Sequence, residues 1–146
     1  MKEILTEDLL AELLLSRDPQ EFIEKYDITS HSLSEYLQAL LEEKGLRRID
    51  VIRSADLNET FGYQIFMGQR KPSRNKILQI AFAMGCTLKE TNRLLQIGEA
   101  NALYCKDRRD AIIVFCVEKH YPLQKVNEEL YRFGEDTICK YALHGN

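Results

Sequence analysis

Hydrophobic residues recur every three or four positions along almost the whole chain, which predicts an all-α protein. In the first 31 residues the pattern predicts two helices. Thr6 is expected to cap the first, whose apolar residues Leu9, Leu10, Leu13 and Leu14 share one side. The second is predicted to start at Asp18-Pro19, a capping residue followed by proline, with Phe22, Ile23 and Tyr26 facing inward.

The next region, from residue 32 to residue 98, contains repeated start and stop signals for helices. Ser32 with Glu35 and Thr87 with Glu90 have the spacing of capping boxes, and Ser73 is placed to cap a helix running to Met84. Glycines at positions 45, 85 and 98 are expected to end the helices that precede them.

The centre of this region, from Arg48 to Gly68, is predicted to form two short helices around a tight turn. Asp56 and Leu57 interrupt the first apolar stripe, Asn58 can cap the second helix, and Gly68 ends it. A basic segment, QRKPSRNK, follows directly. Two short helices followed by basic side chains are typical of a helix-turn-helix that binds DNA.

On these features, residues 33 to 98 resemble the five-helix, lambda-repressor-like DNA-binding domain of the Cro/C1-type (XRE) repressor family. The resemblance rests on the length and order of the helices, the Gly68 stop, the basic loop and the Pro72-Ser73 entry to the next helix. It implies that the second short helix faces the bases through Glu59, Thr60, Tyr63 and Gln64. The expected phosphate contacts are Arg48, Arg53, Arg70, Lys71, Ser73 and Arg74.

Three positions depart from the family pattern. Ile52 stands where a small alanine is common, Asp56 where the turn usually has glycine, and Gly62 where a branched apolar residue is usual. Ile52 and Gly62 are expected to face each other, so exchanging the large and the small residue roughly conserves volume. Asp56 is expected to adopt the left-handed conformation less readily than glycine.

The C-terminal part is predicted to repeat a helical hairpin. The stretch from Arg74 can be aligned with the stretch from Arg109, which pairs Leu88 with Leu123 and Asn92 with Asn127. One extra residue in the second copy would then bring Gly98 over Gly134. We expect a second hairpin from about residue 107 to residue 133, and a short last helix from residue 136 to residue 143 is an open alternative.

The distribution of charge supports DNA binding more than the formal net charge of -3 does. Residues 1–43 contain three basic and eleven acidic side chains, whereas residues 44–76 contain eight basic and three acidic ones. The positive block coincides with the predicted helix-turn-helix, which is what phosphate binding requires.

The sequence offers little support for catalysis, cofactors or a metal. The three histidines lie far apart, and His120 is expected to end a helix. The four cysteines have no spacing typical of a metal site or a disulfide framework, so reduced thiols are expected. No apolar run is long enough to cross a bilayer, and the Met1 end lacks the features of an export signal, so we expect a cytoplasmic location without a membrane partner.

The expected organisation is therefore three parts: acidic helices in residues 1–31, the DNA-binding domain in residues 32–98 and a helical extension in residues 99–146. The expected function is sequence-specific binding of double-stranded DNA by a transcriptional regulator of bacterial or phage type. A homodimer, or a protein partner bound through the acidic helices or the C-terminal hairpin, stays open. The alternative is an adaptor that keeps the helix-turn-helix shape and binds a protein instead.

Overall fold

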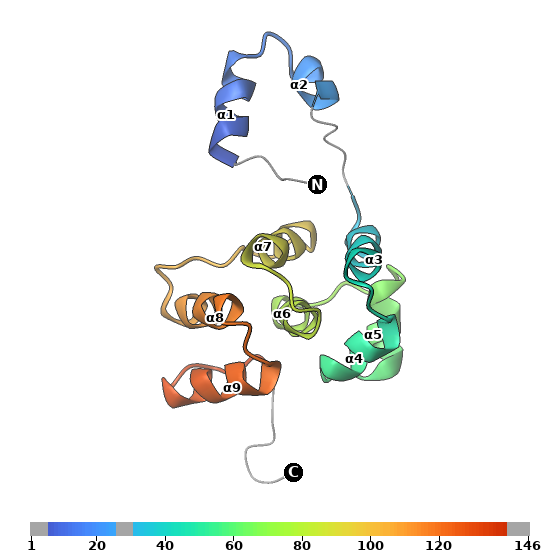
Figure 1. The fold of residues 1–146 in the computed structure, drawn as a ribbon, viewed down its shortest axis with the longest axis vertical. Coiled ribbons are helices and arrows are strands. Elements are labelled where there is room, and N and C mark those ends of the chain that lie inside the picture. The colour runs from blue at the N-terminus through green and yellow to red at the C-terminus, as the bar shows by residue number, and fades with distance from the viewer. Residues whose placement is uncertain (1–5, 26–30, 140–146) are drawn as a thin grey trace. The chain divides into compact units, whose positions relative to one another are not determined.

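Helices account for all the regular secondary structure in residues 6–25 and 31–139, which are the residues that the computed structural model describes. The predicted all-α class is therefore confirmed for this part of the chain. In chain order the helices are α1 Thr6–Leu15, α2 Pro19–Lys25, α3 Leu33–Lys44, α4 Arg48–Ser54, α5 Glu59–Phe66, α6 Arg74–Ala83, α7 Leu88–Ile97, α8 Arg108–Glu118 and α9 Leu123–Arg132 (Figure 1).

The helix ends follow the predicted capping residues closely. The side chains of Ser32, Asn58, Ser73 and Thr87 each accept a hydrogen bond from the backbone N–H three residues further on. Each bond satisfies an N–H that has no partner within its helix. Gly45 and Gly68 are left-handed, with φ of 65° and 76°, so the stops predicted there are confirmed.

The described chain divides into two compact units, residues 1–31 and residues 32–146. The first contains α1 and α2, joined by an ion pair between Glu12 and Lys25 at 3.3 Å. Phe22 is buried as predicted, but Ile23 is 41% exposed, so its predicted inward orientation is wrong. The seven-residue α2 is too short to bury two apolar faces. Tyr26 lies outside the described residues.

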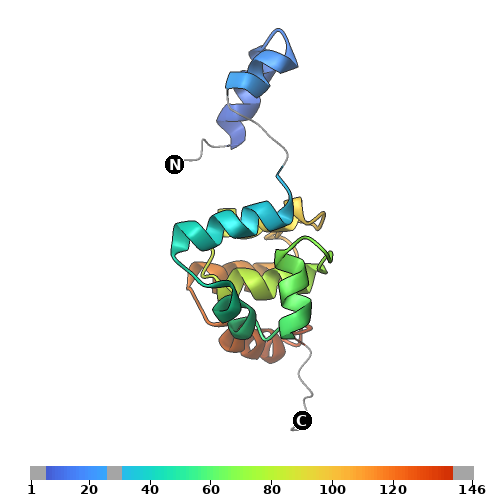
Figure 2. The same ribbon diagram turned by 90° about the vertical axis from the view of Figure 1, so that its right-hand side faces the viewer.

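The second unit is built around α6 (Figures 1 and 2). On one side α6 packs against α4, and on others against α7 and α9, while α3 packs against α5 and α7. The predicted boundary between residues 98 and 99 does not separate compact units, because α8 and α9 share the core of α3–α7. Among the fully buried side chains are Leu37, Ile52, Ile65, Ile77, Leu78, Leu94, Ile113 and Leu130. Burying one such side chain contributes about 1.5 to 3 kcal/mol.

The turn between α4 and α5 has a left-handed residue at Asp56, whose φ is 59°. The Asp56 and Leu57 N–H groups donate to the Arg53 and Ile52 carbonyls at 3.1 and 3.2 Å, which closes the end of α4. Position 56 therefore adopts the conformation that glycine favours, and Asp56 carries the steric cost of doing so.

Gly62 lies against Ile52, as the exchange of large and small residues predicts. A Cβ atom added at Gly62 would be 2.6 Å from Cγ2 of Ile52 and 3.0 Å from its Cγ1. No ordinary van der Waals contact is that short, so α5 can approach α4 this closely only with glycine at position 62. The glycine costs about 1 kcal/mol of helix propensity relative to alanine, and the close contact explains its presence.

The helices α6–α7 and α8–α9 form the predicted repeat, with an offset of 35 residues from Arg74 and Arg109 onward, although α8 begins one residue earlier than this offset implies. The helices α7 and α9 each have 10 residues. Left-handed residues follow the first helix at Gly85 and His120 and the second at Glu99 and Gly134. Glu99 thus corresponds to Gly134, so the predicted extra residue is wrong: it matched glycine with glycine, whereas the backbone matches the two left-handed turns.

The short last helix does not begin within the described residues. Residues 136–139 are not helical, and residues 140–146 lie outside the described part of the chain. His120, expected to end a helix, occupies the left-handed position after α8, where its N–H donates to the Val117 carbonyl at 3.1 Å.

Candidate nucleic-acid interface

The helix α5 buries one face in the core and exposes the other. Gly62, Ile65 and Phe66 are buried, which follows from their spacing along one helical face. Thr60 and Tyr63 are exposed away from this face, and Glu59 is exposed at the start of the helix. The residues that the resemblance assigns to base contacts therefore lie at the surface together, except that Gln64 is only partly exposed.

Arg48, at the start of α4, extends across to α5. Its guanidinium lies over the Tyr63 ring, 4.8 Å from the centroid, and its Nη1 is 3.5 Å from Sδ of Met67. The charge of Arg48 thus rests on an aromatic face and a thioether, neither of which neutralises it.

Arg70 flanks α5 on the side of the basic loop. Its Nε donates to Oε1 of Gln64 at 3.1 Å, and its guanidinium lies 5.3 Å from the centroid of the Phe61 ring. This hydrogen bond occupies the same Gln64 oxygen that would accept from an adenine amino group. An amide oxygen can accept two hydrogen bonds, so Gln64 can recognise a base either together with Arg70 or after Arg70 has moved to a phosphate, which is a suitable alternative partner for the arginine.

Three other basic residues near α5 are paired with carboxylates. Arg53 donates to Glu59 at 3.0 Å, Lys71 lies 2.9 Å from Glu99, and Arg47 donates to Asp50 at 2.8 Å. The hydrogen bond from Lys71 holds the pKa of Glu99 below its usual range. In the pairs made by Arg53 and Lys71 every side chain is more than half exposed. Such exposed pairs are worth about 0 to 1 kcal/mol, so a phosphate can compete for the cation.

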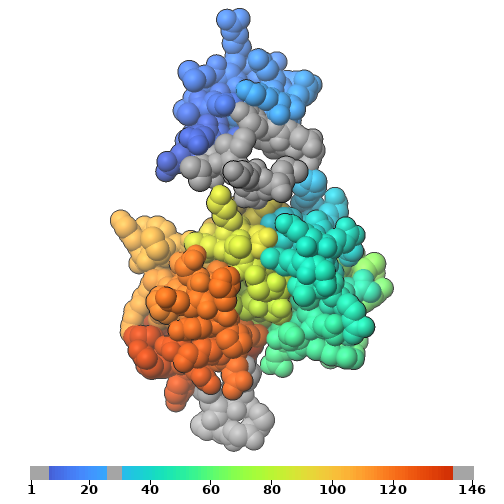
Figure 3. All heavy atoms as spheres, viewed as in Figure 1, coloured from blue at the N-terminus to red at the C-terminus, as the bar shows by residue number. Residues whose placement is uncertain are grey.

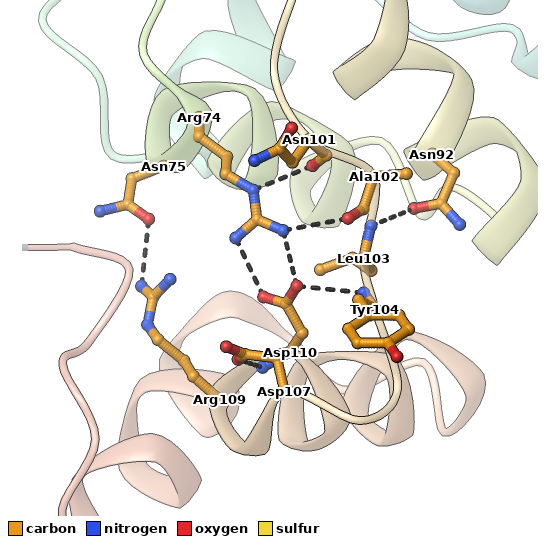
Figure 4. Close-up of polar contacts among 10 residues, drawn as sticks. All are labelled: Arg74, Asn75, Asn92, Asn101, Ala102, Leu103, Tyr104, Asp107, Arg109 and Asp110. Carbon is orange, nitrogen blue, oxygen red and sulfur yellow. Dashed lines mark hydrogen bonds and ion pairs between the residues drawn. The ribbon is translucent and has the colours of Figure 1, made fainter.

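Ser73 and Arg74 differ in what they can offer to DNA. Ser73 is exposed and caps α6 by accepting from the Lys76 N–H at 3.4 Å. Arg74 instead reaches away from α5 to the start of α8, where it makes a two-pronged ion pair with Asp110 at 2.8 and 2.9 Å (Figure 4). It also donates to the carbonyls of Asn101 and Ala102 at 3.0 and 3.4 Å.

Burial and the hydrogen bonds of this cluster together determine the pKa of Asp110. Its side chain is 8% exposed. Burial acts to raise the pKa of Asp110, but hydrogen bonds from Arg74 and from the Tyr104 N–H outweigh it and hold the pKa below its usual range. Arg74 is thus committed to a buried structural pair, and we do not include it in the candidate interface.

The sequence contained a signal for this role of Arg74. In the repeat it aligns with Arg109, a residue outside the basic block. Arg109 makes the same kind of contacts, donating to the carbonyls of Asp136 and Thr137 at 2.8 and 3.3 Å. An arginine that recurs in a hairpin without any DNA-binding motif indicates a bond that the hairpin itself requires.

The described residues contain neither a group of three or more His, Cys, Asp and Glu side chains suited to a metal nor a helix long and apolar enough to cross a membrane. Comparisons of the chain with protein-family models, with curated proteins and with solved structures find no match.

Proposed function

We propose that this chain is a sequence-specific DNA-binding transcriptional regulator of bacterial or phage type. In this proposal α3 to α7 form a lambda-repressor-like domain, α4 and α5 are its helix-turn-helix, and α5 enters the major groove. The proposal includes no catalytic step and no cofactor.

One observation carries the proposal: α5 presents exposed polar side chains between two arginines, Arg48 and Arg70, whose charges rest on neutral groups. Placing two guanidinium groups beside an exposed helix without a carboxylate partner suits a surface that meets phosphates. The unit that contains α5, residues 32–146, has seventeen basic and fifteen acidic side chains, so its formal charge is opposite in sign to that of the whole chain.

The proposed roles follow from the positions of the side chains. Thr60 and Tyr63 face the groove, and Gln64 joins them when Arg70 turns to a phosphate. Arg53 and Lys71 exchange their exposed carboxylate partners for phosphates, and Ser73 sets the free N–H groups of α6 toward the backbone. Glu59 accepts from a cytosine amino group once Arg53 has left it.

The test is binding of fluorescently labelled mixed-sequence duplex DNA, measured by anisotropy at two salt concentrations. We expect binding to weaken steeply as salt rises, because each phosphate contact releases counterions. The variants Arg48→Ala and Arg70→Ala should each lower the slope of the salt dependence by about one. Arg132→Ala is the matched control, because Arg132 also lies over an aromatic ring but belongs to α9.

Selection of bound sequences from a random duplex pool then tests specificity. Enrichment of one site, and its relaxation at one position in the Thr60→Ala or Gln64→Ala variant, is the expected result, at about 1 to 3 kcal/mol for each contact. Binding that enriches no site would contradict a sequence-specific regulator. Arg74→Ala is not a useful probe, because it breaks the pair with Asp110.

The second candidate function is a protein-binding adaptor that retains the shape of a helix-turn-helix. The ion pairs of Arg53, Lys71 and Arg47 favour it, because they neutralise much of the basic block. An adaptor would show no salt-dependent DNA binding, and the Arg48→Ala and Arg70→Ala variants would behave as the original chain does.

A further inference from the structure

The two hairpins, α6–α7 and α8–α9, make equivalent hydrogen bonds to each other. An arginine at the start of each hairpin donates to a side chain of the other. Arg74 of the first hairpin pairs with Asp110 of the second, and Arg109 of the second donates to Oδ1 of Asn75 in the first at 3.0 Å (Figure 4). Asn75 and Asp110 are equivalent positions at the offset of 35. Similarly, α6 packs on α9 while α8 packs on α7. Such reciprocal contacts are those of an approximate two-fold axis rather than of a stack that continues in one direction.

The same offset of 35 governs the bonds within each hairpin. Asn92 accepts from the Leu103 N–H at 2.8 Å, and Asn127 accepts from the Ile138 N–H at 2.7 Å. Each equivalent pair spans eleven residues. The two hairpins can therefore be compared position by position, including the side chains on their outer surfaces.

A groove of about 460 Å³ lies on the outer side of the second hairpin, between α8 and α9. Apolar side chains make up most of its surface. Its lining includes Ile112, Phe115, Tyr121, Glu129, Arg132 and Phe133. Phe115 is 54% exposed and Phe133 is 40% exposed. Figure 3 shows atoms of α8 at the surface of the molecule in this view.

In the first hairpin most of the equivalent positions are buried, although Lys76 and Ile97, which correspond to Ala111 and Arg132, are partly exposed. Ile77 corresponds to Ile112, Ile80 to Phe115 and Leu94 to Glu129, and these three residues of the first hairpin are at most 1% exposed. The two-fold relation means that the second hairpin cannot cover Ile80, since the first hairpin leaves Phe115 exposed. The cover comes from the preceding helices, because α4 packs on α6 and α3 packs on α7.

The groove is therefore the counterpart of a surface that already binds helices in this molecule. At the position equivalent to Gln79, whose Nε2 donates to the Ala55 carbonyl at the end of α4 at 2.8 Å, the second hairpin has Val114. The second hairpin thus lacks the polar bond that fixes α4 on the first hairpin.

The charged side chains around the groove favour a partner helix of negative charge. Lys119 lies over the Phe115 ring at 5.5 Å, Lys125 over the Tyr121 ring at 5.7 Å, and Arg132 over the Phe133 ring at 4.5 Å. Glu129, the acidic residue of the lining, is 3.4 Å from Lys125 and 3.7 Å from Arg132. A positive rim around aromatic rings complements an acidic helix, whereas two such rims would repel each other across a contact between two copies.

We propose that the α8–α9 groove binds an acidic amphipathic helix of a partner protein. The apolar stripe of the partner helix lies on Phe115, Ile112 and Phe133, in the way that helices lie on the equivalent surface of α6–α7. Its acidic side chains face Lys119, Lys125 and Arg132. This site is separate from the α5 surface, so it does not depend on DNA binding.

The experiment uses the full chain and two synthetic helical peptides of about 18 residues, long enough to cover the groove. Both have leucine at helical spacing along one face. The other face has glutamate in the first peptide and lysine in the second. Binding is followed by fluorescence anisotropy, and we expect the acidic peptide to bind at least about tenfold more tightly than the basic one.

Two variants locate the site. Phe115→Ser removes an exposed anchor at the centre of the groove and should weaken the acidic peptide about tenfold or more. Tyr131→Ser is its matched control, because Tyr131 is 65% exposed on α9 but does not line the groove. Should Phe115→Ser fail to fold, Arg132→Glu serves instead, and it should also narrow the preference for the acidic peptide.

Any of the following results would overturn the proposal. The first is absence of binding by the acidic peptide up to millimolar concentration. The second is equal loss in the Phe115→Ser and Tyr131→Ser variants, or equal binding of the two peptides. The third is a dimer in sedimentation equilibrium that Phe115→Ser dissociates, which would make a second copy of the chain the occupant. None of these measurements involves DNA, so they are independent of the test of α5.

Discussion

At the residue scale, the contact between Gly62 and Ile52 sets how closely α5 approaches α4. Ile52 is 1% exposed and fills the space that a larger side chain at position 62 would need. This contact fixes the distance between α5 and α4, and with it the position of the exposed side of α5 relative to the core. The pair is therefore the natural place to test whether the large residue at position 52 and the small residue at position 62 compensate each other.

We predict that Gly62→Ala destabilises the chain, although alanine favours a helix, because overpacking costs about 1 to 3 kcal/mol. Ile52→Ala alone should cost about 2 to 5 kcal/mol through the cavity that it leaves. The double variant Ile52→Ala with Gly62→Val should be more stable than the sum of the single changes predicts. Urea unfolding of the variants, with Gly62→Val alone completing the cycle, measures the coupling.

A coupling energy close to zero would contradict the compensation. It would mean that α5 can move relative to α4 without loss of stability, so that this pair does not set the distance between the two helices. Thr60→Ala is a suitable control, because Thr60 is exposed on the same helix and its change should leave the free energy of unfolding almost unaltered.

The sequence predicted the contact between Gly62 and Ile52 but not the binding partner of Arg74. The closeness of Gly62 to Ile52 follows from helical spacing and volume, both of which are local properties. The binding partner of Arg74 does not, because its charge alone suits a phosphate as well as a carboxylate. Only the fold brings Asp110, 36 residues further on, within 2.8 Å of it.

At the element scale, the start of α6 is fastened to the start of α8 rather than left free. Arg74 and Asn75 belong to the first turn of α6, and Arg109 and Asp110 to the first turn of α8. Their bonds place the two helix starts side by side (Figure 4). The second hairpin therefore supports the end of α6 that follows the basic loop.

The pair of Arg74 and Asp110 should make stability depend on acid pH. The folded-state pKa of Asp110 is lowered, so its contribution to stability is present above the ordinary value of 3.8 and is lost as pH falls through the folded-state pKa. We predict that Asp110→Asn lowers the free energy of unfolding by about 1 to 3 kcal/mol at pH 7. The difference between the two proteins should shrink below about pH 4.

Asp50→Asn is the control for this measurement, because the carboxylate of Asp50 pairs with Arg47 at an exposed position. It should change the pH dependence less than Asp110→Asn does. An equal effect of the two substitutions, or a difference between the original chain and Asp110→Asn that persists unchanged to pH 3, would show that the buried pair does not behave as the geometry implies.

Helix starts and stops were the most predictable elements of the fold. Capping side chains act on N–H groups three residues away, so Ser32, Asn58, Ser73 and Thr87 could be assigned from sequence alone. The residue-by-residue alignment of the two hairpins was harder to predict, because matching identical residues pairs Gly98 with Gly134. The backbone instead places the left-handed Glu99 on Gly134, a substitution that no local pattern signals.

At the scale of the whole molecule, charge is divided between the two units. Residues 1–31 contain three basic and eight acidic side chains, whereas residues 32–146 have a small excess of basic ones. The described part of the second unit has its own core. None of the described residues of the acidic unit belongs to that core.

We predict that a chain starting at residue 32 folds with nearly the same unfolding temperature as the full chain. At low salt it should bind mixed-sequence duplex DNA more tightly, because the net negative unit no longer repels the phosphates. The advantage should fade as salt rises, since screening weakens long-range repulsion first. Anisotropy titrations of both proteins over a series of salt concentrations measure the difference.

A full-length chain with neutral residues in place of Glu7, Asp8 and Glu12 is the matched control, and it should show part of the same gain. Equal affinities of the short and the full chain at every salt concentration would mean that the acidic unit does not act through its charge. Failure of the short chain to fold would mean that residues 1–31 support the core after all.

The reciprocal bonds between the hairpins also suggest how such a chain could arise. When each of two copies uses the same residues to contact the other, the contact has the form found in dimers of identical molecules. A single hairpin with this pattern would be able to dimerise, and a tandem duplication of its coding segment would place both partners in one polypeptide. In one polypeptide the two copies need not be alike: the first packs against α3 and α4, and the second has an open groove lined with aromatic side chains.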